Sequence, residues 1–388
     1  MVPIRYSVRS LGQRLTSSAM TALSVALVVM VLTILLGFVD GLRRTLMQAV
    51  GIDNCILLYR GVTVEAGFIN HQTLDIIRAR PEIATNAKRE PLISPEILGA
   101  FDPTPDAPRA STATIRAIRA IGYEVHNKIK MIEGRRPIRG NNEWIVGQRL
   151  LIRFPNLHLG ATMRLGSTKI KFPIVGVFAD NGSARESEVL MDFDDLAVIN
   201  HISPAELGAT GVHLVLKPGY EDQFKSALRE DDRLKVDLYS EREFYEHAAG
   251  TSNQLRELGL IVAIILAIGA LFGAMNTMYS AVVRRKREVG TLRVLGFGRG
   301  NVLTAFIVES ATLGLCGGVI GEVLAVIVAH ATGLESRLMT VGNMMFSFDL
   351  PPSAFSYGIL CAVIIGVLGG LLPAWQASRL DVVDALRD

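Results

Sequence analysis

Four long apolar runs, separated by polar stretches, decide what kind of fold this chain can adopt. The segments that contain them are 18–42, 240–283, 300–330 and 354–373, and the second begins with a polar stalk. A helix rises about 1.5 Å per residue, so about 20 residues cross a hydrocarbon core of about 30 Å. Composition agrees, because 49% of the 388 residues are hydrophobic and the mean hydropathy is +0.34. We therefore predict a membrane α-helical protein with four transmembrane helices.

The N-terminal segment is expected to stay attached to the first span. The apolar run from about Met20 to Phe38 is longer than the hydrophobic core of a signal peptide, and no convincing cleavage site follows it. Residues 1–17 carry apolar side chains on one helical face and arginines mostly off it. The apolar residues of that face are Ile4, Val8, Leu11 and Leu15. The pattern fits an amphipathic helix in the membrane interface, and a cytoplasmic stub fits equally well.

The polar segment 46–253 has no spanning run and is long enough, at about 200 residues, for one or two globular subdomains. Strand patterns occur at 55–59, 143–146, 162–165, 170–178, 212–216 and 234–238, and helical patterns at 72–79 and 221–229. We predict an α/β lobe built from both ends of the segment, with a β-rich lobe at about 125–191 inserted between them. From 240 the chain is predicted to continue as a helical stalk, which either runs unbroken into the second span or breaks at Gly250.

Charge distribution predicts the topology. A cluster of basic residues follows the second span: Arg284, Arg285, Lys286, Arg287, Arg293 and Arg299. The positive-inside rule makes this connection cytoplasmic. Both termini, including the tail 374–388, are then cytoplasmic, whereas 46–253 and the polar loop 332–352 lie outside. We expect the fourth span to end at Pro373.

No set of residues with catalytic spacing is present. The chain has no phosphate-binding Gly-Lys motif, no His-Glu-x-x-His and no Gly-x-Ser-x-Gly. The seven histidines are scattered, and we interpret them as solvated or core residues rather than metal ligands. The three cysteines, Cys55, Cys316 and Cys361, offer no disulfide framework. Asp192, Asp194 and Asp195 are expected to form a helix cap with solvated charges.

Two groups of residues within the spans carry information about packing. Small residues four apart let helices approach closely, either within one subunit or across a dimer. These pairs are Gly269/Gly273, Gly317/Gly321 and Gly366/Gly370. The intramembrane polar residues Asn276, Glu309 and Glu322 are costly in lipid, so each is expected to face protein or water. Glu309 is placed to pair with a basic residue of the hinge, and Glu322 either marks a polar path or lies near the outer mouth.

The hinge 284–298 offers the most to function. Val289, Leu292 and Leu295 form a short apolar face, and Gly296 is a suitable helix stop. A short amphipathic helix fixed between two membrane helices is suited to docking a partner and passing on its motion. This is a mechanical role that needs no chemistry in the chain.

The hinge also carries a family resemblance. Arg287-Glu-Val-Gly-Thr-Leu-Arg-Val-Leu-Gly296, followed by Glu309 and Gly317-Gly-Val-Ile-Gly321, resembles the signature of MacB/FtsX-like ABC transporter permeases. The segments 269–279 and 372–387 also fit, although Val382 stands where the family often has Pro. The family's architecture is one helix, a large extracytoplasmic domain and then three further helices. The order of elements expected here is the same, so the resemblance covers the whole chain.

The resemblance implies a permease in a bacterial inner membrane that dimerises, as a homo- or heterodimer, and docks a separate cytoplasmic ABC ATPase. ATP and Mg²⁺ would be bound by that ATPase, so no cofactor is expected in this chain. A periplasmic adaptor (membrane fusion protein) and membrane lipids are expected partners, and nucleic acid is not. The coupling residues would be Arg284, Arg285, Lys286, Arg287, Glu288, Gly290, Thr291, Leu292, Arg293, Leu295 and Gly296. Leu292→Asp or Gly290→Trp is predicted to abolish transport in a folded protein.

The role implied is mechanotransmission, in which ATP-driven closure moves the periplasmic domain to export a periplasmic or membrane substrate. Two alternatives stay open at this point. One is an FtsX-like signalling protein that activates a periplasmic hydrolase, and the other is a lipoprotein-releasing permease.

Overall fold

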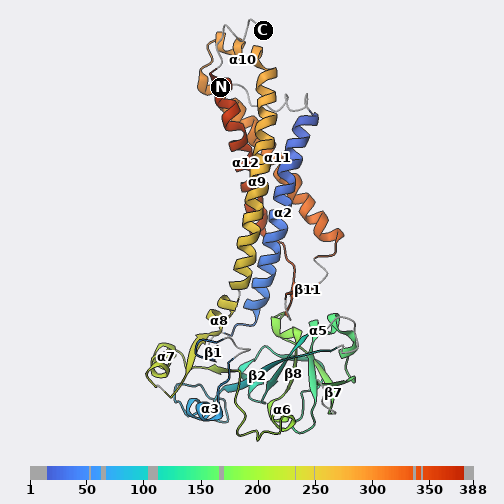
Figure 1. Cartoon of the computed structure of the whole chain (residues 1–388), viewed down its shortest axis with the longest axis vertical. Helices are drawn as coiled ribbons and strands as arrows, with labels where there is room; N and C mark the ends of the chain where they lie inside the picture. Colours follow the sequence, from blue (N-terminus) through green and yellow to red (C-terminus); the bar gives the residue numbers. More distant parts are fainter. Residues whose placement is uncertain are drawn as a thin grey trace. The chain divides into compact units, whose positions relative to one another are not determined.

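The computed structural model describes residues 15–51, 54–62, 67–103, 112–165, 170–231, 233–248, 250–334, 338–341 and 344–379. The expected N-terminal amphipathic helix and Val382 lie outside these residues. The chain divides into two compact units (Figure 1). The helical unit comprises Met1–Gly41, Thr251–Arg337 and Phe348–Asp388, and the domain unit comprises Leu42–Gly250 and Leu338–Ser347. Each is described by itself below.

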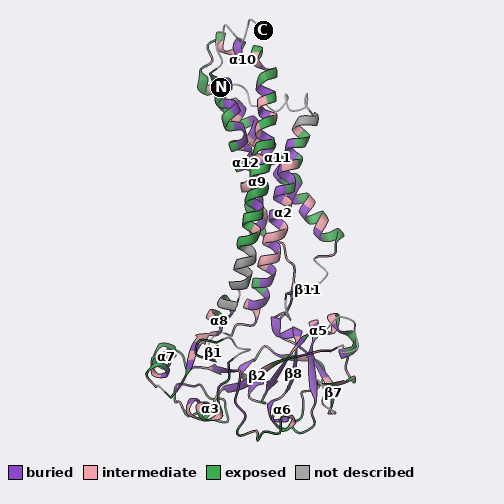
Figure 2. Cartoon of the chain, viewed as in Figure 1, coloured by how far each residue is buried: buried purple, intermediate pink, exposed green. Residues whose placement is uncertain are grey.

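Four helices of the described chain are long and apolar enough to cross a membrane. They belong to α2 (Leu15–Gln48), α9 (Gly250–Arg284), α11 (Arg299–Ala331) and α12 (Pro352–Ser378). The short helix α10 (Lys286–Val294) connects α9 to α11. The buried positions of these helices are mostly alanine, glycine and valine, which let helices pack closely. Large apolar residues such as Ile265 and Phe272 are exposed, and Figure 2 shows long exposed stretches on α9.

Pro373 lies inside α12, which continues to Ser378, so the expected end of the fourth span at Pro373 is wrong. Proline removes one backbone hydrogen bond and its ring crowds the carbonyl of the residue four positions earlier. Here that residue is Gly369, and Gly370 follows it, so no side chain adds to the crowding. Spanning helices also tolerate proline where neighbouring helices pack against it, and Pro373 is buried.

The domain unit is built on one mixed sheet of ten strands, in the order β10-β1-β9-β2-β3-β8-β5-β7-β4, with β6 paired to β7. The strands are β1 (Asn54–Tyr59), β2 (Ile93–Phe101), β3 (Ala113–Ile118), β4 (Lys130–Gly134), β5 (Trp144–Gly147), β6 (Thr162–Arg164), β7 (Lys171–Ala179), β8 (Glu188–Asp192), β9 (Gly211–Val215) and β10 (Val236–Ser240). Of the described strand pairs, β3–β8 and β5–β7 are parallel and the others are antiparallel. The fold class predicted from the sequence, four spans with an α/β and β-rich domain after the first, is confirmed.

Helices and short turns cover this sheet or join its strands. They are α3 (His71–Arg78), α4 (Gly122–Val125), α5 (Gln148–Arg153), η2 (Pro155–Leu157), η3 (Ala184–Ser187), α6 (Phe193–Ile199), α7 (Glu221–Glu230) and α8 (Glu241–Ala248). Residue 249, between α8 and α9, lies outside the described residues, so both forms of the stalk remain predictions. Asp192 caps α6 as expected, but Asp194 and Asp195 are buried rather than solvated. Asp194 pairs with arginines, and Asp195 accepts hydrogen bonds from two backbone N–H groups.

Among the described residues the sheet carries two larger cores, one for each expected lobe, and a smaller cluster that includes Ile145 and Phe178. One is lined by β1, β9, β10, α3 and α7 and includes Leu57, Ile77 and Phe224. The other surrounds Trp144, whose ring stacks on Phe172 at a centroid distance of 4.7 Å. The second lobe is wider than the predicted 125–191, because β3 and the end of β2 also line its core. β2 joins the lobes, since 93–96 pair with β9 and 97–101 pair with β3.

The connection between α11 and α12 is more than a polar loop. It contains the hairpin β11 (Leu338–Val341) and β12 (Met344–Ser347), which belongs to the domain unit. The Met345 backbone N–H donates to Ser187 Oγ over 3.1 Å, and the Arg149 guanidinium donates to the Met345 carbonyl over 3.2 Å. Because the hairpin packs on the domain, this connection and the domain must lie on the same side of the membrane.

Candidate coupling site

The hinge forms a short helix, α10, which is held at its start by a buried ion pair. Arg285, the residue before α10, is buried and its Nη1 lies 2.8 Å from Glu309 Oε2 in α11. Its Nε also lies 3.6 Å from the carboxylate of Glu288. Pairing is required because a lone charge in this environment would be very costly. The pair ties the beginning of the hinge to the adjoining span.

The end of α10 is fixed by its backbone. Gly296 has φ +89°, a conformation that favours glycine. Its N–H donates to the Arg293 carbonyl, and the Phe297 N–H donates to the Leu292 carbonyl. This pair of bonds is the Schellman motif, which satisfies carbonyls left open at a helix end. The glycine stop expected from the sequence therefore has its physical basis.

The inner face of α10 packs into a cluster shared by four helices. Val289 contacts the group formed by Met278 and Val282 of α9, Val302, Phe306 and Leu313 of α11, and Ala374 and Ala377 of α12. Gly290 is buried as well. A displacement of α10 would therefore push directly on α9, α11 and α12, because close-packed side chains transmit displacement.

The outer face of α10 differs from the expected apolar face. Leu295 is 70% exposed and Leu292 is half-buried, so only Val289 of that face is fully inside. The expected coupling residues that lie exposed are Arg284, Arg287, Glu288, Thr291, Leu295 and Gly296, and Lys286 and Arg293 are half-buried. Val294, which was not expected in the set, is exposed as well. Arg285 and Gly290, also expected in the coupling set, face inward instead and support the helix from behind.

The other intramembrane polar residues have different surroundings. Glu322 is buried, and its Oε1 accepts a hydrogen bond from the Thr33 hydroxyl of α2 over 3.1 Å. A Cβ placed on Gly358 of α12 would strike the same oxygen, so Glu322 lies between three helices. Asn276, by contrast, is exposed on α9.

The small-residue pairs fall into two groups, those packed against another helix of the same chain and those that are not. Gly317 and Gly321 of α11 approach the backbone of α2, and Gly366 of α12 lies against Ser310 and Gly314 of α11. Gly370 adjoins Ser310 as well. A Cβ added to Gly269 or Gly273 of α9 would meet no atom within 4 Å, so these two glycines pack against no other described part of the chain.

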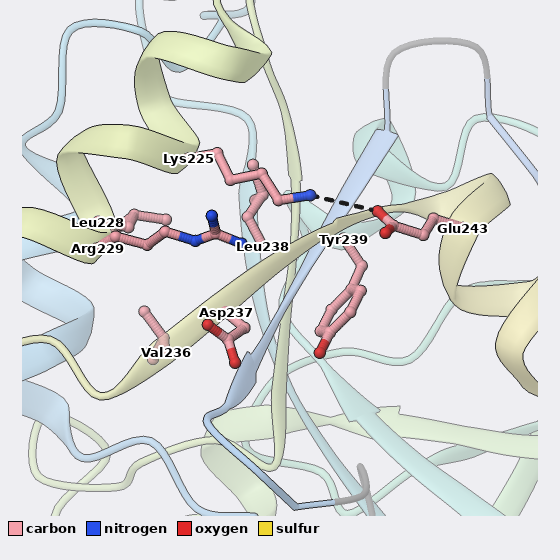
Figure 3. A pocket seen from close by; sticks show the side chains of 8 residues that line it. All are labelled: Lys225, Leu228, Arg229, Val236, Asp237, Leu238, Tyr239 and Glu243. Atoms are coloured by element: carbon pink, nitrogen blue, oxygen red, sulfur yellow. Dashed lines mark ion pairs between the residues drawn. The ribbon is translucent and has the colours of Figure 1, made fainter.

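Two features of the domain were not expected from the sequence. A shallow pocket between α7 and β10 is lined by Lys225, Leu228, Arg229, Val236, Asp237, Leu238, Tyr239 and Glu243 (Figure 3). Lys225 and Glu243 form an ion pair of 3.5 Å at its edge. The second feature is a buried group of Glu96, His126 and His213. These residues are far apart in the sequence, so no spacing signal links them.

Taken together, the helices and the inserted domain define a membrane protein with an extracytoplasmic domain and a packed hinge. The family model of the MacB-like periplasmic core domain matches residues 18–231, and that of the FtsX-like permease C-terminal matches residues 260–382. The chain belongs to the family of MacB/FtsX-like ABC transporter permeases.

Several curated relatives are similar over much of the chain. It is 28% identical over 257 residues to "Macrolide export ATP-binding/permease protein MacB" of Nitrosomonas europaea, covering 60% of this chain and 35% of that protein. It is 29% identical to "Pyoverdine export ATP-binding/permease protein PvdT" of Pseudomonas entomophila, in a match that covers 71% of this chain and 39% of that protein. It is 28% identical to "Uncharacterized ABC transporter permease YknZ" of Bacillus subtilis, in a match that covers 71% of this chain and 70% of that protein. The chain thus spans well under half of the two exporters.

Two solved structures are similar to part of this chain. The periplasmic region of MacB from Actinobacillus actinomycetemcomitans covers 52% of this chain and 95% of its own, with 10% identity and a TM-score of 0.38. The extracellular domain of YknZ from Gram-positive bacteria covers 48% and 99%, with 13% identity and a TM-score of 0.36.

Proposed function

We propose that the chain is the permease subunit of a MacB-like ABC exporter in a bacterial inner membrane. A separate cytoplasmic ATPase docks on α10, and its closure moves the periplasmic domain, which acts with a periplasmic adaptor on a periplasmic or membrane substrate. The names of two relatives, both export ATP-binding/permease proteins, support the pairing with an ATPase. ATP and Mg²⁺ belong to that partner.

The observation that carries this proposal is the contrast between the two faces of α10. Its inner face packs on three spans, through Val289, and its start is held by the Arg285–Glu309 pair. Its outer side leaves Leu295 70% exposed and the neighbouring Val294 61% exposed, with charged side chains around them. Exposed apolar side chains that lie together and are rimmed by polar residues mark protein contact sites. A partner bound there would deliver its motion to the spans without a flexible joint.

The test is reconstitution of the chain with its partner ATPase. Leu295→Asp places a charge in the proposed contact and is expected to weaken ATPase binding about tenfold or more. The reason is that the loss of an apolar contact and the burial of a charge together cost more than about 1.4 kcal/mol of binding free energy. Transport and stimulated ATP hydrolysis fall with it. The measurement is pull-down of the ATPase together with the hydrolysis rate in proteoliposomes.

The matched control is Ile152→Asp, which charges an equally exposed apolar residue (67%) in the domain unit and should leave ATPase binding unchanged. Wild-type binding and transport in a folded Leu295→Asp protein would refute the docking role. Purification with a hydrolase and no adaptor would instead support the signalling alternative.

We also infer that α9 forms the contact between two copies. Leu258, Val262, Ile265, Gly269, Phe272 and Asn276 recur at alternating spacings of four and three, so they form one stripe. All six are exposed. An amide facing lipid is costly, and a second copy of the stripe would give Asn276 a partner and let Gly269 and Gly273 approach closely.

A further inference from the structure

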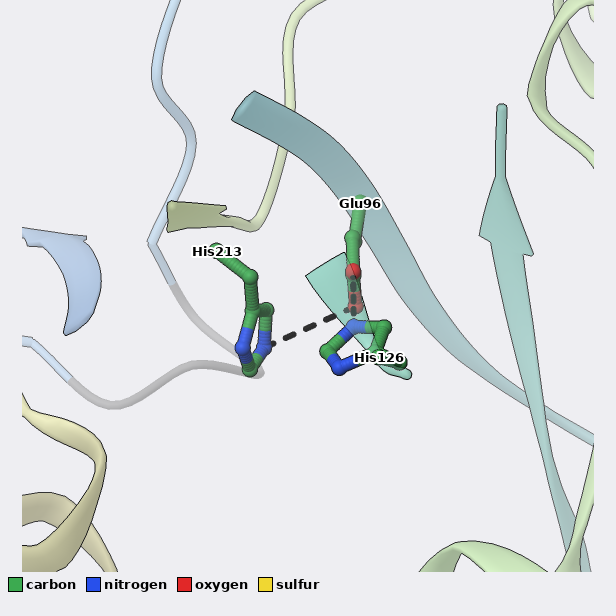
Figure 4. A group of neighbouring side chains, drawn as sticks. All are labelled: Glu96, His126 and His213. Carbon is green, nitrogen blue, oxygen red and sulfur yellow. Dashed lines mark hydrogen bonds and ion pairs between the residues drawn. The ribbon is translucent and has the colours of Figure 1, made fainter. Parts of the chain in front are cut away.

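Three potential metal ligands meet in the core of the domain unit. Glu96 lies in β2, His213 in β9 and His126 directly after α4, and all three side chains are buried (Figure 4). Their donor atoms lie within 4.8 Å of one another. His126 Nε2 is 2.6 Å from Glu96 Oε1, and His213 Nε2 is 3.5 Å from Glu96 Oε2. Two imidazoles therefore converge on one carboxylate.

His213 has a carboxylate beside each of its ring nitrogens, so it can donate a proton from Nδ1 while Nε2 coordinates an ion. Its Nδ1 lies 3.7 Å from Glu241 Oε1, and neither atom has a hydrogen-bond partner in the described chain. A proton on Nδ1 directed at Glu241 leaves a lone pair on Nε2, which faces Glu96. A lone pair facing a carboxylate across 3.5 Å is repulsive unless a cation lies between them.

The charges around the group leave room for a cation. Ion pairs connect four carboxylates (Glu96, Asp180, Glu188 and Glu241) to two guanidiniums (Arg116 and Arg185). Counted over these carboxylates and guanidiniums alone, the set of described residues holds two more negative than positive charges. An uncompensated charge in a protein interior is very costly. One divalent ion would balance the set.

We propose that Glu96, His126 and His213 bind a single divalent transition-metal ion, for which Zn²⁺ is the best chemical match. Imidazole nitrogens and a carboxylate oxygen are common zinc ligands, at about 2.0–2.2 Å from the ion. Ligands around a tetrahedral ion then lie about 3.3 Å apart. The His213–Glu96 separation already fits, and His126 would retreat from its hydrogen bond to Glu96 by less than about 1 Å.

The outer groups of this site match those of known metal centres. A ligating histidine commonly donates its other ring N–H to a carboxylate, as Glu241 would accept from His213. Glu241 is the first residue of α8, and its Oε2 accepts from the Gly51 N–H over 2.5 Å. Arg116 Nη1 lies 2.6 Å from Glu96 Oε2, the same oxygen that faces His213, and so fixes the orientation of the carboxylate toward the ion. The ion would thus join two strands to the point where the chain leaves the sheet.

The experiment uses the full chain purified in detergent without a histidine tag. Metal analysis is expected to give about one Zn²⁺ per chain, and Co²⁺ added after chelation should produce the visible d–d absorption of nitrogen and oxygen ligation. His213→Gln and His126→Gln should each weaken Co²⁺ binding at least about tenfold. His158→Gln, which alters an exposed histidine of the same unit, is the matched control and should bind as wild type.

Glu241→Gln keeps all three ligands and guards against histidine variants that fail to fold. It is expected to retain the Co²⁺ absorption while losing about 10–100-fold in affinity, because the orientation of His213 is less well held. A chain that gives no d–d band with Co²⁺ overturns the proposal. Thiolate charge-transfer bands, or full binding by a folded His213→Gln protein, overturn it as well, since they place the ion elsewhere.

Discussion

The Arg285–Glu309 pair is the residue-level feature on which the hinge depends most. Both side chains are at least 90% buried, so removal of one partner leaves a charge with little water around it. Glu309→Leu is expected to destabilise the protein by about 3–5 kcal/mol, whereas the double variant Arg285→Met/Glu309→Leu should recover most of that loss. Thermal or denaturant unfolding in detergent measures both.

The control for this cycle is Arg284→Met, which removes an exposed neighbouring charge and should change stability by no more than about 0.5 kcal/mol. If the single and double variants prove equally unstable, the pair is not the source of the loss, and packing around Glu309 is.

Single residues were predictable where the signal is local. Gly296 as a helix stop and Asp192 as a cap follow from the few residues around them, and both are found. The surroundings of Glu96 and His213 were not predictable, because they face each other only once β2 and β9 pair. The exposure of Leu295 was not predictable for a similar reason. Helical periodicity predicts which residues share a face, but it does not predict whether another element covers that face.

At the scale of elements, the glycine pairs make a prediction that separates folding from assembly. A side chain at Gly366 would meet the Ser310 carbonyl at 2.6 Å, so Gly366→Leu should force α11 and α12 apart and lower the unfolding temperature. Gly273→Leu faces open space and should leave the folded subunit intact while weakening the proposed dimer. Unfolding curves and detergent-solubilised mass separate these effects.

The opposite result would be informative in each case. A stable Gly366→Leu protein would contradict the tight α11–α12 contact. A Gly273→Leu protein that dimerises as well as wild type would move the interface away from the α9 stripe.

Elements differed in how far the sequence predicted them. The spans and β1, β7 and β9 were expected near their observed places, because apolar runs and alternation are strong there. β2 was missed, since it carries Pro95, Gly99 and the buried polar residues Ser94 and Glu96 and so lacks any alternation. The sequence rule that proline ends a helix led to the wrong end for α12. That rule does not include the glycine at 369 or the packing of neighbouring helices, and both allow the helix to continue past Pro373.

At the scale of the whole molecule, membrane orientation can be checked directly. Thr340 lies exposed in the hairpin of the domain unit, and Arg287 lies exposed on α10. In a cysteine-free background, Thr340→Cys should react with a membrane-impermeant maleimide in intact spheroplasts, and Arg287→Cys only after permeabilisation. The physical reason is the basic hinge, which the positive-inside rule retains in the cytoplasm. The reverse labelling pattern would invert the topology.

The overall architecture was predictable from the sequence because it rests on length and hydrophobicity alone. The sharing of one sheet by both lobes was not, since strand order depends on contacts between distant residues such as Ile97 and Ala117. The sequence also could not predict that the hairpin belongs to the domain unit. The residues that hold the hairpin there, Arg149 and Ser187, lie far from it in the chain.

The adjacency of β1 and β10 has an evolutionary consequence. These strands are the first and last of the ten-stranded sheet and pair antiparallel, so the chain enters and leaves the sheet at neighbouring points. The Gly51 N–H and the Glu241 carboxylate join the two points directly. A segment whose ends lie side by side can be gained, lost or exchanged by recombination without altering the helices that flank it. Replacement of the segment between β1 and β10 would leave the residues of the hinge unchanged, and the hairpin 338–347 would need new contacts in place of those with Arg149 and Ser187.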